Sequence, residues 1–519
     1  MLTVVLRVYH YWGREFGRFL NSWANGNFVL IALGLLLALF TVQRAAKKLP
    51  VRQRTMLFLS LITAVGALLR LNGLKFQSLW YDELVTLTIS SGKNISQVIA
   101  LARQDTYPPL QYFITHFVVN YIGNSETMLR YPFALAGIVV IPFMFLLGRR
   151  LFSAKEGLMT AALTATLYCP VYFSQELRAY SLLLLFSVAS VYFLLRITAS
   201  LRKEVSPSLW VLAAYVGSAL LCAYSHYSGL LFVFLQASFV LAQFVARSHG
   251  RKTLLIVFAA ILLGYLPWVS GLLFQLHHVL PRFQTGAPHL FSFLEAVAFF
   301  FRSSPELLVV LIFFLLYPLY RSPLSRKEFL LALLLTGPFL LLYMLSKCGL
   351  TIFELRYLLI SLPAAYLLAA RGIILLSEKI KQQEALPMLL SCLLAVALIS
   401  SRYYTTPAKP QHRETAAALT SLRETYPEAA LVGFVGNREM LEYYLSRVTK
   451  LNNTVLLEPD AQSIERINAA LGASRHPYFA VFYLNAAPRN DFSQTLKNKY
   501  QLIEEKEFVK DSIFLFRSN

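Results

Sequence analysis

The chain has 519 residues, of which 57% are hydrophobic and only 14% are charged, and its mean hydropathy is +0.55. Soluble domains carry about a quarter charged residues, so this composition excludes a wholly soluble protein and predicts a polytopic membrane protein. The net charge of +21 raises the question of nucleic-acid binding, but the basic residues form short clusters between apolar runs, as the positive-inside rule predicts. No nucleic-acid partner is therefore expected.

A membrane span needs about 20 mostly apolar residues. The sequence predicts about twelve spans, one of them in an N-terminal segment (1–54) and the others in a transmembrane domain (55–402). In chain order the predicted spans cover 27–43, 55–72, 131–148, 157–173, 179–196, 208–226, 229–246, 253–271, 306–320, 328–346, 357–375 and 386–401.

Lysine and arginine in the connecting loops predict the orientation of these spans. The basic loops are expected in the cytoplasm, and they are 44–54, 148–156, 202–204, 247–252, 321–327 and 377–382. The alternate loops and everything after Arg402 are then extracytoplasmic, in a protein of the cytoplasmic (inner) membrane. The orientation of residues 1–26 stays open, because that segment carries three arginines.

Residues 73–130 are expected to form one large outer loop. The apolar stretch 110–123 is short for a span and contains His116 and Asn120, and counting it would place every later basic loop outside. It therefore predicts a helix in the membrane interface, and 95–104 predicts a second one.

The composition changes after Arg402, where no apolar run of spanning length follows. Residues 403–519 are expected to fold as a small extracytoplasmic α/β domain, because helical and strand patterns alternate. The patterns predict helices over 412–427, 438–447 and 461–474, strands over 429–436 and 478–485, and a last edge strand over 514–517.

Charged residues gather at the outer ends of the predicted spans, whereas the span centres hold almost none. These residues are Asp82, Glu83, Arg130, Glu176, Arg178, His226, Glu354 and Arg356. Secondary transporters place their site near the bilayer midplane, so this pattern favours an enzyme that works at the outer interface. A donor sugar carried on a polyprenyl phosphate would suit that place. One carboxylate could act as general base and arginines could stabilise the leaving phosphate.

The order of short motifs resembles the membrane glycosyltransferases of the C superfold, in the branch of the protein O-mannosyltransferases and lipid A aminoarabinose transferases. The motifs cover about 55–400, and they are a "DE" pair (82–83), "YPPLQYF" (107–113), "LRYPFALAGI" (129–138), "GRRLF" (148–152), "FSQELRAYSL" (173–182), "AYSHYSG" (223–229), "YLPW" (265–268) and "LRYLLISLPA" (355–364). The fold class expected from this resemblance is a polytopic α-helical C-superfold protein. Tyr107 departs from the family, which often has histidine there, and with Pro108 and Pro109 it is expected to shape a turn before the interfacial helix.

The resemblance implies a transferase that moves a sugar from a polyprenyl-phosphate carrier to a hydroxyl of a protein, lipid or glycan, with inversion. It implies that Asp82 is the catalytic base, with Glu83 as its companion. The residues expected to contact carrier phosphate or substrate are Arg130, Arg178, Arg356, Glu176, Tyr180, His226 and Tyr357. No cofactor and no metal site are expected, and metal dependence is left open.

Each candidate also has a structural interpretation. Asp82 could cap a helix over 83–90, and Glu83 could interact with that helix's dipole. Arg178 and Arg356 each follow a glutamate by two positions and could form ion pairs between loops, whereas Arg130 could anchor the interface and His226 could be a satisfied interface histidine. An alternative function is a transporter or flippase for a lipid-linked saccharide, for which the span count is the main argument.

Overall fold

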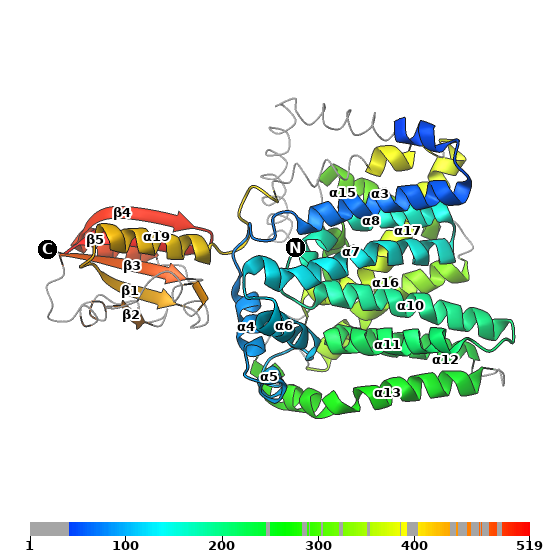
Figure 1. Ribbon diagram of the computed structural model, residues 1–519, viewed down its shortest axis with the longest axis horizontal. Helices are drawn as coiled ribbons and strands as arrows, with labels where there is room; N and C mark the ends of the chain where they lie inside the picture. The colour runs from blue at the N-terminus through cyan, green and yellow to red at the C-terminus, as the bar shows by residue number, and fades with distance from the viewer. Residues whose placement is uncertain are drawn as a thin grey trace. The chain divides into compact units, whose positions relative to one another are not determined.

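The computed structural model describes residues 41–244, 250–282, 288–289, 291–302, 305–320, 325–349, 353–382, 384, 386–391, 403–435, 443–444, 454–457, 465, 467, 469, 477–484 and 490–518. The chain divides into two compact units, each with its own apolar core (Figure 1). The helical unit comprises Met1–Asn72, Gly92–Val118 and Leu129–Arg402. The sheet unit comprises Gly73–Ser91, Val119–Met128 and Tyr403–Asn519, so two segments of the predicted loop 73–130 group with the C-terminal part of the chain.

The helical unit is built from helices of very different lengths. They are α3 (Val51–Leu71), α5 (Ile95–Ala102), α6 (Leu110–Tyr121), α7 (Glu126–Leu151), α8 (Ala154–Thr166), α9 (Tyr168–Ser174), α10 (Tyr180–Arg202), α11 (Leu209–Ser225), α12 (Tyr227–Phe244), α13 (Arg251–Phe274), the π-helix η1 (Gln275–Val279), the 3-10 helix η2 (Leu280–Arg282), α14 (Ser292–Phe300), α15 (Pro305–Tyr320), α16 (Arg326–Lys347), the 3-10 helix η3 (Leu355–Ser361) and α17 (Leu362–Lys379).

Within the described residues, six helices are long and apolar enough to cross a membrane, and they cover Val51–Leu71, Glu126–Leu151, Tyr180–Arg202, Arg251–Arg282, Arg326–Lys347 and Leu355–Lys379. Leu209–Ser225, Tyr227–Leu241 and Glu306–Tyr320 are shorter apolar helices. The expectation of a multi-pass helical membrane protein is confirmed, while the count of about twelve spans stays a prediction. Most of 27–43 and of 386–401 lies outside the described residues, and 157–173 forms two shorter helices.

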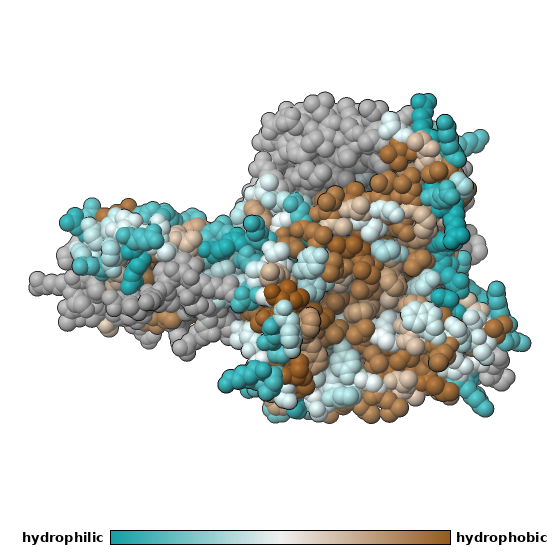
Figure 2. All heavy atoms as spheres, viewed as in Figure 1, coloured by the Kyte–Doolittle hydropathy of each residue, from teal (hydrophilic) through white to brown (hydrophobic). Residues whose placement is uncertain are grey.

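The surface of the helical unit is apolar along the sides of its helices. Figure 2 shows apolar side chains over the helix sides and polar ones gathered at the right-hand helix ends. Leu255, Leu262 and Leu263 of α13 and Val309 of α15 are among the exposed large side chains. Such a surface is costly in water and suits hydrocarbon, where helices satisfy their backbone polar groups internally.

The predicted span 157–173 is broken at Leu167, which has extended backbone angles between α8 and α9. A continuous helix would press the Pro170 ring against the carbonyl of Thr166, four residues earlier, whereas proline is tolerated in the first turn of a new helix. The break leaves carbonyls at the end of α8. The buried Arg70 of α3 donates to two of them, Thr164 at 2.7 Å and Ala165 at 3.1 Å.

The carbonyls at the C-terminal end of α3 receive hydrogen bonds from the segment after α9. The Gln175 side-chain amide donates to the carbonyls of Leu69 (3.1 Å), Arg70 (3.0 Å) and Asn72 (2.6 Å). These are carbonyls at the end of a helix, which need partners when they leave water. The exchange fixes the start of the segment 175–179, which carries Glu176 and Arg178.

A buried charge cluster joins α8, α16 and α17. Arg371 of α17 lies 2.5 Å from the Glu156 carboxylate and 3.7 Å from that of Glu328. Each glutamate also bonds to the N-cap serine of its own helix: Glu156 accepts from the Ser153 hydroxyl, and Glu328 accepts from the Ser325 backbone N–H at 2.9 Å in a capping box. One guanidinium therefore holds two helix N-termini against α17.

The sheet unit contains five strands, β1 (Ala430–Val435), β2 (Thr454–Leu457), β3 (Tyr478–Leu484), β4 (Gln501–Phe508) and β5 (Asp511–Arg517), in the order β2-β1-β3-β5-β4. β1 pairs in parallel with β2 and β3, and β5 pairs antiparallel with β3 and β4. The unit also contains α4 (Tyr81–Ser90), α19 (His412–Thr425) and α23 (Asn490–Lys499). Its core includes Val432, Phe434, Val481, Phe514 and Phe516.

Several elements match the sequence patterns. α19, β1 and β3 lie where a helix and two strands are expected, and α5 and α6 lie where two loop helices are expected. The interpretation of 514–517 as an edge strand is wrong, because β5 lies inside the sheet between β3 and β4. The edge strand on this side of the sheet is β4, whose charged sequence "QLIEEKEF" lacks a clear strand pattern. The predicted helices 438–447 and 461–474 lie almost wholly outside the described residues.

Close packing of α15 on α17 provides a test of this fold. A Cβ added to Gly372 of α17 would lie 2.0 Å from the Phe314 carbonyl oxygen, so Gly372→Ala must push the helices apart. We expect a loss of about 1–3 kcal/mol, seen as a lower Tm in detergent. Gly217→Ala in α11 is the matched control, because nothing lies within 4 Å of its Cβ position. That variant should be neutral or stabilised by about 0.5–1 kcal/mol. An equal Tm for the two variants would contradict the packing.

Candidate functional site

The candidate residues fall into both units. Asp82 and Glu83 lie in the sheet unit, on α4, and all the other candidates lie in the helical unit. The candidate residues therefore form two groups, one in each unit, and each group is described by itself.

In the sheet unit, the first turn of α4 carries the acidic pair. The helix begins at Tyr81, so the interpretation of Asp82 as the cap of a helix over 83–90 is wrong. Glu83 has the capping function instead, because its carboxylate accepts from the backbone N–H of Trp80 at 3.3 Å. Asp82 is half-buried, whereas Glu83 is fully buried and its carboxylate lies 3.6 Å from the Lys409 ammonium. The two carboxylates thus differ in environment, and the cap of α4 belongs to Glu83 rather than to Asp82.

In the helical unit, the candidate residues meet around Tyr107. The Arg178 guanidinium lies over the Tyr107 ring at 4.1 Å from its centroid. The Tyr107 hydroxyl is hydrogen-bonded to the Tyr180 hydroxyl at 2.7 Å, and its ring lies edge-on to His226 at 5.0 Å. The His226 ring in turn lies 4.8 Å from that of Tyr357. We call Tyr107, Arg178, Tyr180, His226 and Tyr357 the tyrosine cluster.

Local structure explains why these side chains meet. Arg178 lies just before α10, Tyr180 begins α10, His226 separates α11 from α12, and Tyr357 lies in η3. Each therefore lies at or beside a helix end. The α11–α12 turn is especially tight, since a Cβ on Gly229 would lie 2.2 Å from the Cys222 carbonyl oxygen.

His226 is oriented by its own turn. Its Nδ1 accepts from the Ser228 backbone N–H at 3.0 Å, which caps the start of α12. A ring nitrogen that accepts from a backbone N–H carries no proton, so the neutral ring has its N–H at Nε2. His226 is thus a satisfied histidine, as its structural interpretation requires, and it still has one donor to offer.

Two arginines of the helical unit lie close enough to the tyrosine cluster to affect it electrostatically. Arg178 and Arg356 both influence His226 and Tyr180 electrostatically. Glu354, which precedes η3, acts on Tyr357 and partly balances the Arg356 charge. Arg178 is buried, and its flat guanidinium is held by stacking, an arrangement in which arginine keeps its donors in a fixed plane.

Two further candidates are buried in the helical unit. Glu176 lies in the segment after α9 and acts electrostatically on Cys169, and Arg130 lies near the start of α7. Their contact with a phosphate or a substrate stays a prediction.

Sequence reasoning assigned Tyr107 only to a turn before α6, although its ring is central to the tyrosine cluster. The turn is present, since α6 begins directly after Pro108 and Pro109. The tyrosine at a family position that often holds histidine was the available signal. Gln275 at the start of η1 gave no signal, yet its amide donates to the carbonyls of Ala102 at 2.9 Å and Tyr107 at 3.3 Å.

The tyrosine cluster brings three kinds of hydrogen-bond donor together. It presents guanidinium, hydroxyl and imidazole donors, which are the groups that bind phosphate oxygens with charge-assisted hydrogen bonds. A metal is a separate matter: across the described ranges, no three His, Cys, Asp or Glu residues group closely enough to hold a metal ion.

Comparisons with known proteins show which folds this one resembles. Residues 106–270 match the family model of dolichyl-phosphate-mannose-protein mannosyltransferase. Among solved structures, ArnT from Cupriavidus metallidurans bound to undecaprenyl phosphate has a TM-score of 0.53 at 13% identity, covering 90% of this chain and 98% of that one. Its apo state has a TM-score of 0.53 at 14% identity, covering 89% and 97%. No match was found among curated proteins.

A further similar structure is the archaeal oligosaccharyltransferase AglB from Archaeoglobus fulgidus, in complex with an inhibitory peptide and a dolichol-phosphate. Its TM-score is 0.48 at 13% identity, covering 82% of this chain and 69% of that one. The fold is that of a C-superfold membrane glycosyltransferase, which confirms the resemblance found in the sequence. Within that class, the similarity is to ArnT and to the mannosyltransferase family model.

Gln275 supports the tyrosine cluster through its hydrogen bond to the Tyr107 carbonyl, and a substitution can test this support. Gln275 is fully buried, bonds to Ala102 and Tyr107, and accepts a hydrogen bond from the Tyr227 hydroxyl. Gln275→Leu removes the side-chain donor to the Tyr107 carbonyl and one of two donors to the Ala102 carbonyl, which also accepts from the Asp105 backbone N–H. The loss should cost about 1–3 kcal/mol, so we expect a clearly lower Tm. Gln494→Leu, which removes one exposed hydrogen bond to Asn498, is the control. A Gln275→Leu variant as stable as the control would rule out this support of Tyr107.

Proposed function

We propose that the protein is a glycosyltransferase that moves a sugar from a polyprenyl-phosphate carrier to an acceptor hydroxyl. The acceptor belongs to a protein, a lipid or a glycan. The reaction takes place at the outer face of the cytoplasmic membrane, with the chain after Arg402 extracytoplasmic, as the basic loops suggest.

One observation carries this proposal: the Arg178 guanidinium stacks on Tyr107 at 4.1 Å, among hydroxyl and imidazole donors, at the ends of apolar helices. An apolar helical surface suits the hydrocarbon tail of the carrier, and a fixed guanidinium suits its phosphate. The fold is shared with ArnT, which was solved with undecaprenyl phosphate bound, and this supports the same carrier chemistry here.

In the proposed mechanism, Asp82 is the general base. Its carboxylate takes the proton of the acceptor hydroxyl while the hydroxyl oxygen attacks the anomeric carbon. The bond between that carbon and the phosphate oxygen breaks, and the phosphate keeps the electron pair. Arg178 and Arg356 stabilise the charge that develops on the phosphate, so the leaving group needs no proton. Attack from the side opposite the phosphate inverts the configuration.

The other candidates have supporting functions in this proposal. Tyr180, His226 and Tyr357 orient the phosphate or the sugar beside the arginines. Arg130 and Glu176 contact the carrier phosphate or the substrate. Glu83 acts through the first turn of α4, because its carboxylate is buried and caps that helix.

The mechanism gives no step to a metal or a cofactor, and we propose that transfer needs neither. Membranes treated with a chelator should keep their transfer activity. A loss that returns on addition of a divalent cation would contradict this part of the proposal.

Replacing the base tests the reaction itself. Asp82→Asn keeps the shape of the side chain and removes its proton acceptor, so transfer from a labelled polyprenyl-phosphate sugar in membranes should fall by about 10²–10⁴-fold. Glu424→Gln, at an exposed position of α19, is the control and should transfer normally. Preserved transfer in a well-expressed Asp82→Asn protein would remove Asp82 from its function. Movement of the intact lipid-linked sugar without bond cleavage would instead indicate a transporter or flippase.

A second variant tests the phosphate contact. Arg178→Lys keeps the charge but loses the planar fork and the stack on Tyr107, so the KM for the donor should rise about tenfold. Arg202→Lys is the matched control, since Arg202 lies at the far end of α10 and bonds to Gln243 at 2.6 Å. Unchanged donor kinetics in Arg178→Lys would argue against phosphate binding by Arg178.

A further inference from the structure

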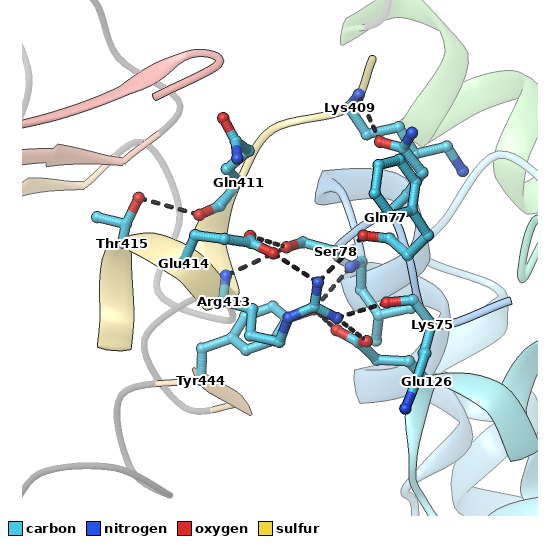
Figure 3. Close-up of polar contacts among 12 residues, drawn as sticks. Lys75, Gln77, Ser78, Glu126, Lys409, Gln411, Arg413, Glu414, Thr415 and Tyr444 are labelled. Carbon is cyan, nitrogen blue, oxygen red and sulfur yellow. Dashed lines mark hydrogen bonds and ion pairs between the residues drawn. The ribbon is translucent and has the colours of Figure 1, made fainter. Parts of the chain in front are cut away.

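The five residues before Trp80, Lys75 to Leu79, are held by the C-terminal part of the sheet unit (Figure 3). Arg413 of α19 is the main contact. Its guanidinium donates to the carbonyls of Lys75 at 2.6 Å and Phe76 at 3.1 Å, to Glu414 at 2.5 Å and to the Glu126 carboxylate. Burial disfavours the Arg413 charge, but Glu126 and Glu414 more than offset this, so the pKa of Arg413 is raised above its usual value.

Gln77, Ser78 and Leu79 are held as well. The Gln77 amide oxygen accepts from the backbone N–H groups of Ala408 at 3.0 Å and Lys409 at 3.1 Å. The Ser78 hydroxyl donates to Glu414 at 2.7 Å. The Leu79 N–H donates to the Tyr444 hydroxyl at 2.6 Å, and that hydroxyl donates to Glu126 at 2.5 Å.

The contact continues into α4 through a buried ion pair. Lys409 and Glu83 have their charged groups 3.6 Å apart, and their side chains are 4% and 0% exposed. The same Glu83 carboxylate caps α4 by accepting from Trp80. A buried carboxylate needs an opposite charge or hydrogen bonds to stay ionised, so Lys409 supports the cap from which α4 begins.

These hydrogen bonds involve the whole segment 75–79. Each of the residues 75–79 makes a hydrogen bond to 406–414 or to Tyr444, through its backbone or its side chain. Asp82 lies in the first turn of the helix that this segment leads into. A rigid backbone before a helix and a fixed cap within its first turn determine where the second residue of that helix places its side chain.

We propose that residues 406–414 are part of the transfer machinery, in which Lys409 and Arg413 are positioning residues that hold Asp82 in its productive place. The inference rests on the proposed function, because it takes Asp82 to be the base. Lys409 acts through Glu83 and the cap of α4, and Arg413 acts through the backbone of 75–76. A displacement of about 1 Å at a reacting group can cost about 10²-fold in rate.

Kinetics separate positioning from donor binding and from simple stability. Lys409→Met leaves Glu83 buried beside an apolar side chain, so we expect kcat to fall at least about tenfold while the donor KM stays within about twofold. Lys497→Met is the matched control, because it breaks another lysine–glutamate pair of the sheet unit, to Glu505 at 2.8 Å. The control should keep its kcat.

A double variant tests the means of positioning. In Glu83→Gln/Lys409→Met both charges are gone, and the introduced side-chain amide can still accept from the Trp80 N–H through its oxygen. We expect kcat to recover at least about fivefold relative to Lys409→Met. A double variant that stays as slow as the single one, although folded, would overturn the proposal, because Lys409 would then be needed for its own charge.

Further outcomes are equally decisive. If Lys409→Met is not recovered as folded protein, the double variant Glu83→Gln/Lys409→Met provides the test. A near-native kcat of the double variant supports positioning. A loss of kcat as large as that of Asp82→Asn contradicts it. A folded Lys409→Met protein with native kcat overturns the inference while Asp82→Asn still abolishes transfer. Native transfer in Asp82→Asn is a different result, since it removes the proposed function itself.

Discussion

A charged side chain that leaves water must meet an opposite charge or a set of hydrogen bonds, and both units of this protein are organised around that constraint. In the helical unit, Arg70 donates to the carbonyls at the C-terminal end of α8, and Arg371 pairs with the first-turn glutamates of α8 and α16. In the sheet unit, Arg413 meets two carbonyls and two carboxylates. Each arginine joins segments that are distant in sequence, so these paired charges hold helix ends and loops together.

The same constraint explains the character of the tyrosine cluster. Arg178 is buried yet stacked on an aromatic face, which orients the guanidinium and keeps the plane of its donors fixed. The donors around it come from three separate helix ends. A site of this kind depends on every one of these elements, because each contributes one group to a shared geometry.

The sequence was sufficient for the class of fold and for four of the five residues of the tyrosine cluster, because apolar runs and short motifs at their ends are local signals. Arg178, Tyr180, His226 and Tyr357 were chosen from the sequence and do meet in the structure. Tyr107 and Gln275 were not chosen, since their importance comes from contacts with residues far along the chain. The edge strand β4 was missed for a related reason: its charged side chains are mostly exposed, and only its pairing with β5 defines it as a strand.

Long separation in sequence has one more consequence, in biosynthesis. The partners Ser78 and Glu414 are 336 residues apart. At about 5–20 residues per second, roughly 15–70 seconds of translation separate the two. During that time α4 lacks Lys409, the ion-pair partner of its capping residue Glu83. The ribosome must therefore translate past residue 414 before this early segment can make its final contacts, and a shorter nascent chain lacks the hydrogen bonds that hold residues 75–78.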